Sequence, residues 1–479
     1  MKGRAGGRSR SKTFRLAPLA TALMTSGLAW AGNTIPVGDC SDDPSDGLSL
    51  RNAVAKAMPG DTVDASHLNC STITLTTGSP PKSNGPIVVN QAAPGITILG
   101  PGADKLAIDG ANANRVITQT GAGPLTIDGL TITHGKIDTA HVSTPPKGGC
   151  IASYGTLYLD NTIVSGCTVT SAKAADYISG GGVYSGVGGA VLHLTHSTIT
   201  GNTVSHPTTS GAQFGGGIFA RGNGNVTLLD SIVSNNRVSG NVAGVGDGGG
   251  INAEVGTFVS TSSSFTGNYA GDQGGGLKLF YSASVTLSGS TIANNSTANA
   301  TSGIFIEGGQ ATITNSTISG NHSNWGGALG FDGVATATFQ NSTIAFNTGG
   351  GLYTYKGGTL DVESTILASN GSSDLKLAGS TPTKISGSAN LVMGSSSVLP
   401  PGFLAVPIGT DPALSPLTHN GGPTLTHQLL AGSPALGNGN NKSGVLTDQR
   451  LYPRTTSGKT DIGAVEYDTI FADGYQGVP

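Results

Sequence analysis

Residues 274–295 read GGGLKLFYSASVTLSGSTIANN, which is three glycines, an alternating stretch, a Ser-Thr-Ile stretch and an asparagine. The same order recurs along the chain from starts at positions 148, 180, 215, 248, 274, 301, 326 and 349. In these repeats the start precedes the asparagine position by 19–22 residues, whereas the next start follows it after 2–13 residues. Nearly all insertion therefore falls at one corner of the repeating unit.

The residues between these landmarks alternate with a period of two, which is typical of strands and not of helices. Short strands, glycine turns and one tolerant corner in repeats of 23–35 residues predict an all-β, single-stranded solenoid, the parallel β-helix. Stacked coils of such a fold lie ~4.8 Å apart, so equivalent residues form columns. The first aliphatic residue of each repeat, as at Ile218, Ile251 and Leu277, should therefore lie in one continuous core.

An asparagine closes the third stretch of seven repeats: Asn202, Asn236, Asn268, Asn295, Asn321, Asn347 and Asn370. The asparagine amide can satisfy backbone groups at a turn, and asparagine tolerates left-handed backbone. Stacked asparagines also hydrogen-bond to one another. We predict a structural ladder; N-linked glycosylation at sequons such as Asn321-His322-Ser323 is the alternative.

The first 31 residues differ from the rest, with six Lys and Arg residues before an apolar run from Leu16 to Trp30. The run ends in Ala29-Trp30-Ala31, so the pattern predicts a secretory signal peptide, with an uncleaved anchor as the alternative. The remaining chain would carry 18 basic against 27 acidic residues, a net charge of −9. This balance argues against a nucleic-acid partner.

We expect four regions: a signal peptide at 1–31, an N-terminal cap at 32–85, β-helix coils at 86–374 and a C-terminal cap at 375–479. The segment Leu48–Met58 is amphipathic and is followed by Pro59-Gly60, so it predicts a short helix in the N-terminal cap. Such a helix would cover the open end of the column, where unpaired strand edges invite aggregation.

The four cysteines form an even set in an exported chain, which favours disulfides. Cys150 lies at a glycine start and Cys167 takes the asparagine position of the same repeat. We expect their Cα atoms to lie near one coil spacing apart, which suits a disulfide. Cys40 and Cys70 bracket the N-terminal region, and we expect the second bridge there. No cysteine or histidine set has zinc-site spacing.

Two terminal motifs resemble known families. Ser49-Leu50-Arg51-Asn52-Ala53-Val54 is similar to the CSLREA-type motif of secreted β-helix proteins, with Leu48 and Asn52 replacing the motif's Cys and Glu. The C-terminal region resembles the choice-of-anchor Q domain through Asp411-Pro412, Asn420-Gly421-Gly422-Pro423-Thr424, Thr426-His427, Gly432-Ser433-Pro434-Ala435, Asp448-Gln449-Arg450 and Asp461-Ile462-Gly463-Ala464. It departs from that domain at Gly437 and Leu451, where Asp and Gly are usual.

The repeats themselves resemble those of polymorphic-outer-membrane-protein-like solenoids. The tail Ile470-Phe471-Ala472-Asp473-Gly474-Tyr475 is similar to one on exported proteins of some Gram-negative bacteria. Together the resemblances imply a right-handed β-helix that is secreted or held on the outer surface of a Gram-negative cell. They imply no particular reaction.

Two columns should face outward on the first strand of each repeat, because side chains alternate across a strand. The first column is Ala152, Tyr184, Phe219, Asn252, Lys278, Phe305, Gly330 and Tyr353. The second column is Tyr154, Gly186, Arg221, Glu254, Phe280, Glu307, Asp332 and Tyr355. One outer face therefore collects aromatic and charged residues, and exposed apolar area of this kind marks binding surfaces.

The leading hypothesis is a secreted or cell-surface, adhesin-like scaffold that binds glycans. Its candidate ligand-binding residues are Tyr184, Phe219, Arg221, Lys278, Phe280, Phe305, Tyr353 and Tyr355. The alternative is a polysaccharide lyase or glycoside hydrolase that uses the carboxylates Glu254, Glu307 and Asp332, of which two one coil apart could act as a pair. A third reading is that the aromatic rings only shield the sheet.

The catalytic motifs of β-helix enzymes are absent from the sequence. Thr133-His134-Gly135 is weakly similar to one of them. No cofactor is expected, and calcium finds no support because carboxylates are sparse among the coils. Three long corners, Thr168–Ser179, Thr203–Phe214 and Arg237–Asp247, form a rival binding ridge. The oligomeric state is not indicated.

Overall fold

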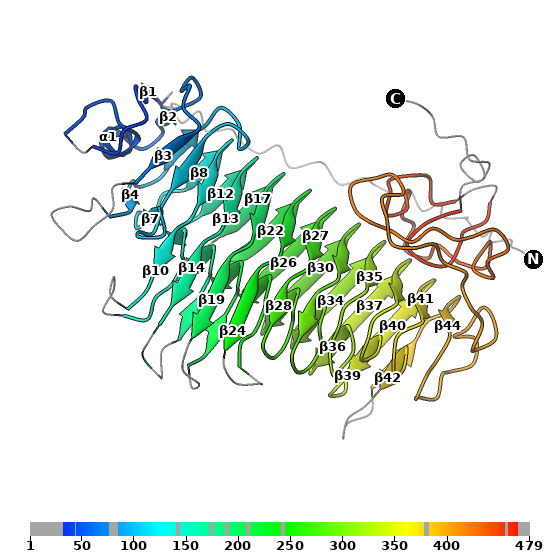
Figure 1. Cartoon of the computed structure of the whole chain (residues 1–479). Coiled ribbons are helices and arrows are strands. Elements are labelled where there is room, and N and C mark those ends of the chain that lie inside the picture. Colours follow the sequence, from blue (N-terminus) through cyan, green and yellow to red (C-terminus); the bar gives the residue numbers. More distant parts are fainter. Residues whose placement is uncertain are drawn as a thin grey trace, which may run out of the picture. The chain divides into compact units, whose positions relative to one another are not determined.

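The computed structural model describes residues 32–43, 45–75, 85–139, 144–171, 173, 177–186, 191–206, 211–240, 245–377, 383–455 and 458–467. These residues belong to one compact unit, Gly32–Pro479. It is a right-handed parallel β-helix whose coils stack in sequence order (Figure 1), as the repeats predict. The predicted signal peptide, residues 1–31, lies outside the described residues.

Each coil contributes one strand to each of three long sheets, here called C, A and B in chain order. Sheet C contains β4 (Ile87–Val89), β7 (Ile117–Gln119), β11 (Ile151–Ser153), β16 (Val183–Gly186), β21 (Ile218–Arg221), β25 (Ile251–Glu254), β29 (Leu277–Phe280), β33 (Ile304–Glu307), β36 (Leu329–Asp332), β39 (Leu352–Thr354) and β42 (Leu375–Leu377). Sheet A contains β1 (Thr34–Pro36), β2 (Thr62–Asp64), β5 (Ile96–Leu99), β8 (Leu125–Asp128), β12 (Leu157–Asp160), β17 (Leu192–Thr195), β22 (Asn225–Leu229), β26 (Thr257–Thr261), β30 (Ser284–Ser288), β34 (Gln310–Thr314), β37 (Thr336–Gln340), β40 (Thr359–Glu363) and β43 (Lys384–Ser386).

Sheet B contains β3 (Thr72–Thr74), β6 (Ala107–Asp109), β9 (Thr131–Thr133), β13 (Ile163–Ser165), β18 (Thr198–Thr200), β23 (Ile232–Ser234), β27 (Ser264–Thr266), β31 (Thr291–Ala293), β35 (Thr317–Ser319), β38 (Thr343–Ala345), β41 (Ile366–Ala368) and β44 (Leu391–Val392). The corner between the asparagine position and the next repeat start takes up the insertions and is here called the elastic corner. It carries sheet D, with β10 (Lys136–Ile137), β14 (Thr168–Thr170), β19 (Thr203–His206), β24 (Arg237–Gly240), β28 (Tyr269–Ala270) and β32 (Ser296–Thr297). In the same corner β15 (Ile178–Ser179) pairs with β20 (Gln213–Phe214).

The asparagine ladder runs through the interior beside sheet B. The Asn202 Nδ2 donates to Asn236 Oδ1 at 2.9 Å, and the Asn202 backbone N–H donates to the same oxygen at 3.0 Å. The pattern repeats down the column until Asn370 donates to Asp374 Oδ1 at 2.9 Å. All seven side chains are buried, which fits the structural reading and leaves a sequon such as that of Asn321 inaccessible to glycosylation.

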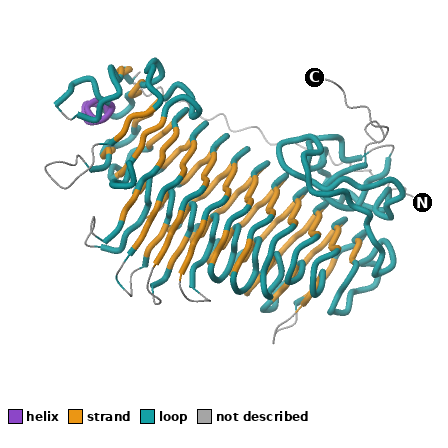
Figure 2. The backbone as a smooth tube through the Cα atoms, viewed as in Figure 1, coloured by secondary structure: helices purple, strands orange, loops and turns teal. Residues whose placement is uncertain are grey.

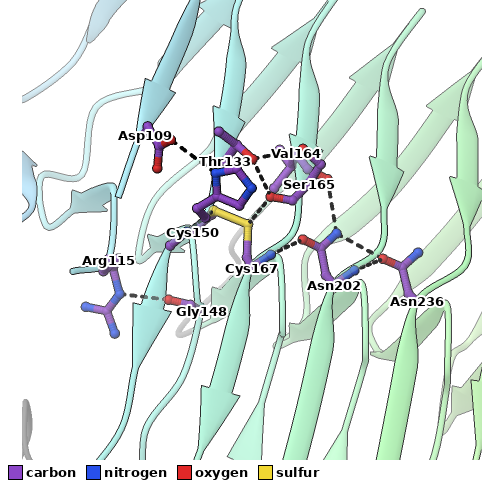
Figure 3. The surroundings of a disulfide bond; sticks show 12 residues. Asp109, Arg115, Thr133, Gly148, Cys150, Val164, Ser165, Cys167, Asn202 and Asn236 are labelled. Atoms are coloured by element: carbon purple, nitrogen blue, oxygen red, sulfur yellow. Dashed lines mark hydrogen bonds and ion pairs between the residues drawn. A yellow bond between two sulfur atoms is a disulfide. The ribbon is translucent and has the colours of Figure 1, made fainter. Parts of the chain in front are cut away.

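Both expected disulfides are present. The Cα atoms of Cys150 and Cys167 lie 5.5 Å apart, and those of Cys40 and Cys70 lie 6.4 Å apart. Figure 3 shows the first bridge at the upstream end of the asparagine ladder, where the Cys167 N–H donates to Asn202 Oδ1 at 3.0 Å. The bridge thus takes the place of one asparagine and is fully buried.

The single helix of the described residues lies at the N-terminal end of the stack, as Figure 2 shows. α1 (Leu50–Lys56) is shorter than the predicted Leu48–Met58, because Ser49 is its N-cap and accepts from the Asn52 N–H. Its buried face, Leu50, Ala53 and Val54, joins the core of the coils. The helix therefore covers the first coil, as expected of a cap.

The C-terminal residues 411–455 and 458–467, here called the C-terminal module, do more than close the end of the column. They fold back along the outer face of sheet B (Figure 1). Thr291 Oγ1 donates to the Leu425 carbonyl at 2.6 Å, and Thr317 Oγ1 donates to Gln449 Oε1 at 2.6 Å. The last coil is instead covered by residues 395–405, where Phe403 is fully buried.

Candidate functional site

The outer face of sheet C carries the two columns in the predicted register. Tyr184 pairs with Phe219, and Lys278 pairs with Phe305 on the next strand. In the second column Glu307 lies directly beside Asp332. The structure therefore brings together the candidate residues on β29, β33 and β36, and leaves those on β21 and β16 two and three coils away from β29.

The expectation that the first-column aromatic rings are exposed is wrong. Tyr184, Phe219, Phe305 and Tyr353 are only 4–7% exposed. Side chains from the elastic corner cover them: the Phe214 ring lies 5.7 Å from Phe219. These rings shield the sheet and offer little surface to a ligand.

A left-handed glycine occupies seven of the eight repeat starts and directs this covering, and the eighth start is Thr301. Gly215 has φ of +63°, and a Cβ at this position would lie 2.1 Å from the Ile218 carbonyl oxygen. Only glycine allows the chain to turn so tightly here. The turn places the preceding residue over sheet C. These covering residues, Lys147, Ser179, Phe214, Asp247 and Gln273, were missed by sequence reasoning, although their constant position before the glycines was a readable signal.

The three candidate carboxylates are each paired with a cation. Glu254 lies 3.0 Å from Arg221, and Glu307 lies 3.9 Å from Lys278. Lys356 lies 2.9 Å from Asp332 Oδ1 and donates to Asp332 Oδ2 at 3.1 Å, and this hydrogen bond raises the pKa of the Lys356 ammonium. Each carboxylate of the second column therefore has a cation beside it, although Glu307 and Asp332 lie next to each other in that column.

A buried polar group lies beneath these ion pairs. Lys278 is almost fully buried, donates to Gln273 Oε1 and lies 4.1 Å from the Phe305 ring centre. Burial raises the pKa of Asp247 to about 6, although the charge of Lys278 lowers it. Asp247 Oδ1 and Asn252 Oδ1 are buried and accept no hydrogen bond from the described residues. Burying Asp247 and Asn252 without hydrogen-bond partners costs free energy. The charge of Lys278 offsets part of this cost for the Asp247 carboxylate.

Exposed aromatic rings surround the C-terminal part of this face. Trp325 is 52% exposed and Tyr281 is 72% exposed. Trp325 contacts Tyr355 at 6.5 Å between ring centres, and Tyr281 contacts Phe280 at 4.0 Å. We call these four rings, together with Glu307, Asp332 and Lys356 between them, the Trp325 patch.

Trp325 was missed because it lies in the elastic corner, outside both columns. Its indole N–H donates to Asn299 Oδ1 at 2.9 Å, and Asn299 Nδ2 donates to Asp272 Oδ1 at 2.6 Å. These bonds hold the ring in place while half of the residue stays exposed. The patch spans β29 to β39, three coil spacings or ~14 Å.

Among the residues that the structure describes, no group of three or more His, Cys, Asp or Glu side chains is placed to hold a metal ion. Within the same residues, no helix is long and apolar enough to cross a membrane. The three long corners proposed as a rival ridge run partly through residues outside the described ranges, so that alternative stays a prediction.

The chain was compared with solved structures, with curated proteins and with family profiles. A crystal structure of the pectate lyase Pel9A is similar, with a TM-score of 0.41 and 15% identity over 91% of this chain and 97% of that chain. No curated protein matches the sequence. The profile described as "Right handed beta helix region" matches residues 108–324 and 302–398, together more than half of the chain. The chain therefore belongs to the right-handed β-helix family.

Proposed function

We propose that this protein is an extracellular β-helix scaffold that binds a neutral polysaccharide along the outer face of sheet C, at the Trp325 patch. The observation that carries the proposal is the pair of exposed aromatic sites, Trp325 with Tyr355 and Tyr281 with Phe280, on either side of adjacent carboxylates. Tyr and Trp combine a flat apolar body with a polar tip, which suits sugar rings with C–H faces and hydroxyl edges.

The polar groups of the patch supply the hydrogen bonds that a glycan needs. Glu307 is partly exposed, so its free oxygen lone pairs can accept from sugar hydroxyls. Lys356 is the most exposed cation beside Glu307 and Asp332 and can donate to ring or glycosidic oxygens. A ligand would therefore lie along the column, with its ring faces on the aromatic side chains.

Charge favours a neutral glycan over a polyanionic one. Each carboxylate of the outer column neutralises a cation, so no unpaired basic cluster forms there. Polyanion recognition instead needs an excess of Lys and Arg on one surface.

Cleavage of a polysaccharide is the second candidate function. Glu307 and Asp332 occupy neighbouring strands, and carboxyl groups about 5 Å apart are the spacing of retaining glycosidases. The separate cation on each carboxylate favours binding, because a hydrolytic pair needs one protonated member.

An extracellular location is part of the proposal. It is supported by the two disulfides, which persist in oxidising compartments. The resemblance of residues 411–464 to the choice-of-anchor Q domain supports display on a cell surface, and the tail at residues 470–475 supports a Gram-negative host.

The test is calorimetric titration of the chain with neutral gluco-, manno- and xylo-oligosaccharides, with polygalacturonate as the charged comparison. We expect a neutral oligosaccharide to bind, and the double variant Trp325→Ala/Tyr281→Ala to lose at least tenfold in affinity. Tyr177→Ala is the matched control, since Tyr177 is 63% exposed but lies far along the stack. Reducing ends or unsaturated uronates released on prolonged incubation would support cleavage, and binding unchanged in the double variant would refute the assigned patch.

A further inference from the structure

A concave site lies away from the Trp325 patch, where the C-terminal module meets sheet B. A cavity of about 530 Å³ opens between the turns after β31, β35 and β38 and the module segment 414–427. Its walls are mainly apolar: Phe346, Leu414, Pro416, Leu417 and Leu425. Ser319, Gly320, Asn294 and His427 supply its polar lining.

The polar lining contains a serine hydrogen-bonded to a histidine. Ser319 Oγ lies 2.8 Å from His427 Nε2, and His427 Nδ1 lies 2.7 Å from the Ser415 carbonyl oxygen. A carbonyl oxygen can only accept, so Nδ1 carries the ring proton and Nε2 is left as the acceptor. The histidine therefore faces the serine hydroxyl as a base.

Burial keeps this base uncharged. His427 is 4% exposed, and desolvation lowers its pKa despite the hydrogen bond to Ser415, which raises it. A neutral imidazole at neutral pH is the form that accepts a proton from a hydroxyl.

The sequence around Ser319 leaves space for a reacting group. Elsewhere in the same column of sheet B, hydroxyl residues bond to one another, as Thr200 does to Ser234 at 3.0 Å. Ser319 instead stands between Ala293 and Ala345 on the two neighbouring strands. Its hydroxyl thus has no hydroxyl neighbour in the column, and its hydrogen bond goes to the histidine.

We propose that Ser319 is a nucleophile for acyl transfer from carboxylic esters bound in this cavity, with His427 as general base and the Ser415 carbonyl as its orienting group. A nucleophile bonded to a base that is itself held by a third group is the arrangement that activates serine. The site is separate from the Trp325 patch and does not depend on glycan binding.

The reaction balances without a cofactor. Ser319 Oγ bonds to the ester carbonyl carbon while its proton passes to His427 Nε2. The C–O bond to the leaving alcohol then breaks, and the alkoxide takes that proton, leaving acyl-Ser319. Water attacks the acyl carbon with His427 again as base, the Ser319 oxygen is expelled and reprotonated, and a carboxylic acid leaves.

Asn294 is the side-chain amide in the cavity lining that would serve as an oxyanion donor. It lines the cavity, and its side chain lies beside Gly320, the residue that follows Ser319. Side-chain amides serve as oxyanion donors, and loss of one lowers kcat about 100–1,000-fold. The apolar walls favour esters of short aliphatic acids, since such acyl groups gain from burial.

The experiment treats the full mature chain with a fluorophosphonate and with p-nitrophenyl acetate and butyrate. We expect the phosphonate adduct on Ser319 by peptide mass spectrometry, and ester hydrolysis that falls at least 100-fold in Ser319→Ala and in His427→Gln. Hydrolysis should also fall as the pH drops through the lowered pKa of His427. Ser234→Ala, a serine of the same column that bonds only to Thr200, should keep full labelling and activity.

Wild-type protein that gives no adduct at Ser319 would overturn the proposal without any variant. An adduct or hydrolysis that persists in Ser319→Ala would overturn it as well. Thermal unfolding of each variant separates lost chemistry from lost structure. If Ser319→Ala unfolds, the wild-type adduct site and the pH profile still decide the matter.

Discussion

The outer faces of sheets B and C are both covered, but by segments at very different distances along the chain. On sheet C the cover comes from the same coil: Phe214 lies on Phe219, five residues on. On sheet B it comes from the C-terminal module: Thr317 bonds to Gln449, 132 residues away. The local cover leaves Trp325 and Tyr281 exposed, whereas the distant cover forms one wall of the Ser319 cavity. A residue from the same coil thus shields one column of side chains on sheet C, whereas the folded C-terminal module forms a concave site with sheet B.

The largest loss in the free energy of unfolding is expected from Arg454→Ala. This change should detach the C-terminal module from sheet B and leave the cover of sheet C intact. Arg454 is fully buried, lies 3.3 Å from Glu466 and donates to the Gly463 carbonyl. Removing one partner of a buried ion pair costs about 3–5 kcal/mol. Hydrogen exchange should accelerate in β31, β35 and β38 and stay slow in sheet C. Equal acceleration in both sheets would contradict the separation of the two covers.

A smaller loss in the free energy of unfolding is expected from Gly215→Ala. This change should disturb the turn that places Phe214 over sheet C. The new Cβ meets the Ile218 carbonyl oxygen at 2.1 Å in a left-handed residue, so we expect a loss of about 3 kcal/mol in the free energy of unfolding. Gly333→Ala is the control, since Gly333 has the same φ sign but nothing within 4 Å of the added Cβ. It should cost only about 1 kcal/mol. Equal losses by chemical denaturation would show that the close approach does not matter.

The smallest stability effect is expected from Asp247→Asn, and it depends on pH. Asp247 has a folded pKa of about 6, above the value near 4 of an unfolded chain. The folded state therefore binds more protons, and the stability of the wild type should fall as pH rises from 4 to 6. Above pH 6 the variant should be more stable by about 1–2 kcal/mol. A variant that is less stable at pH 7.5 would show that the charge of Asp247 is favourable beside Lys278.

The sequence predicts those features that repeat with the coil. The spacing from Gly274 to Asn295 predicts the stacking register, the asparagine ladder and the Cys150–Cys167 bridge, because each depends on residues one coil apart. The burial of Tyr184 was missed, because the residues before each start, such as Lys147 over the Tyr184 ring, were not recognised as a cover of sheet C. The contact of Ser319 with His427 could not be predicted either, because no periodicity relates the module to sheet B.

The most direct test of the central claim uses the chain's own fluorescence. The sequence has two tryptophans, Trp30 and Trp325, and Trp30 lies in the predicted signal peptide, so Trp325 alone would report from the mature chain. We predict a saturable change in its emission when a neutral oligosaccharide is added, with no change for polygalacturonate at the same ionic strength. Emission that stays constant across the neutral oligosaccharides would contradict glycan binding at the Trp325 patch.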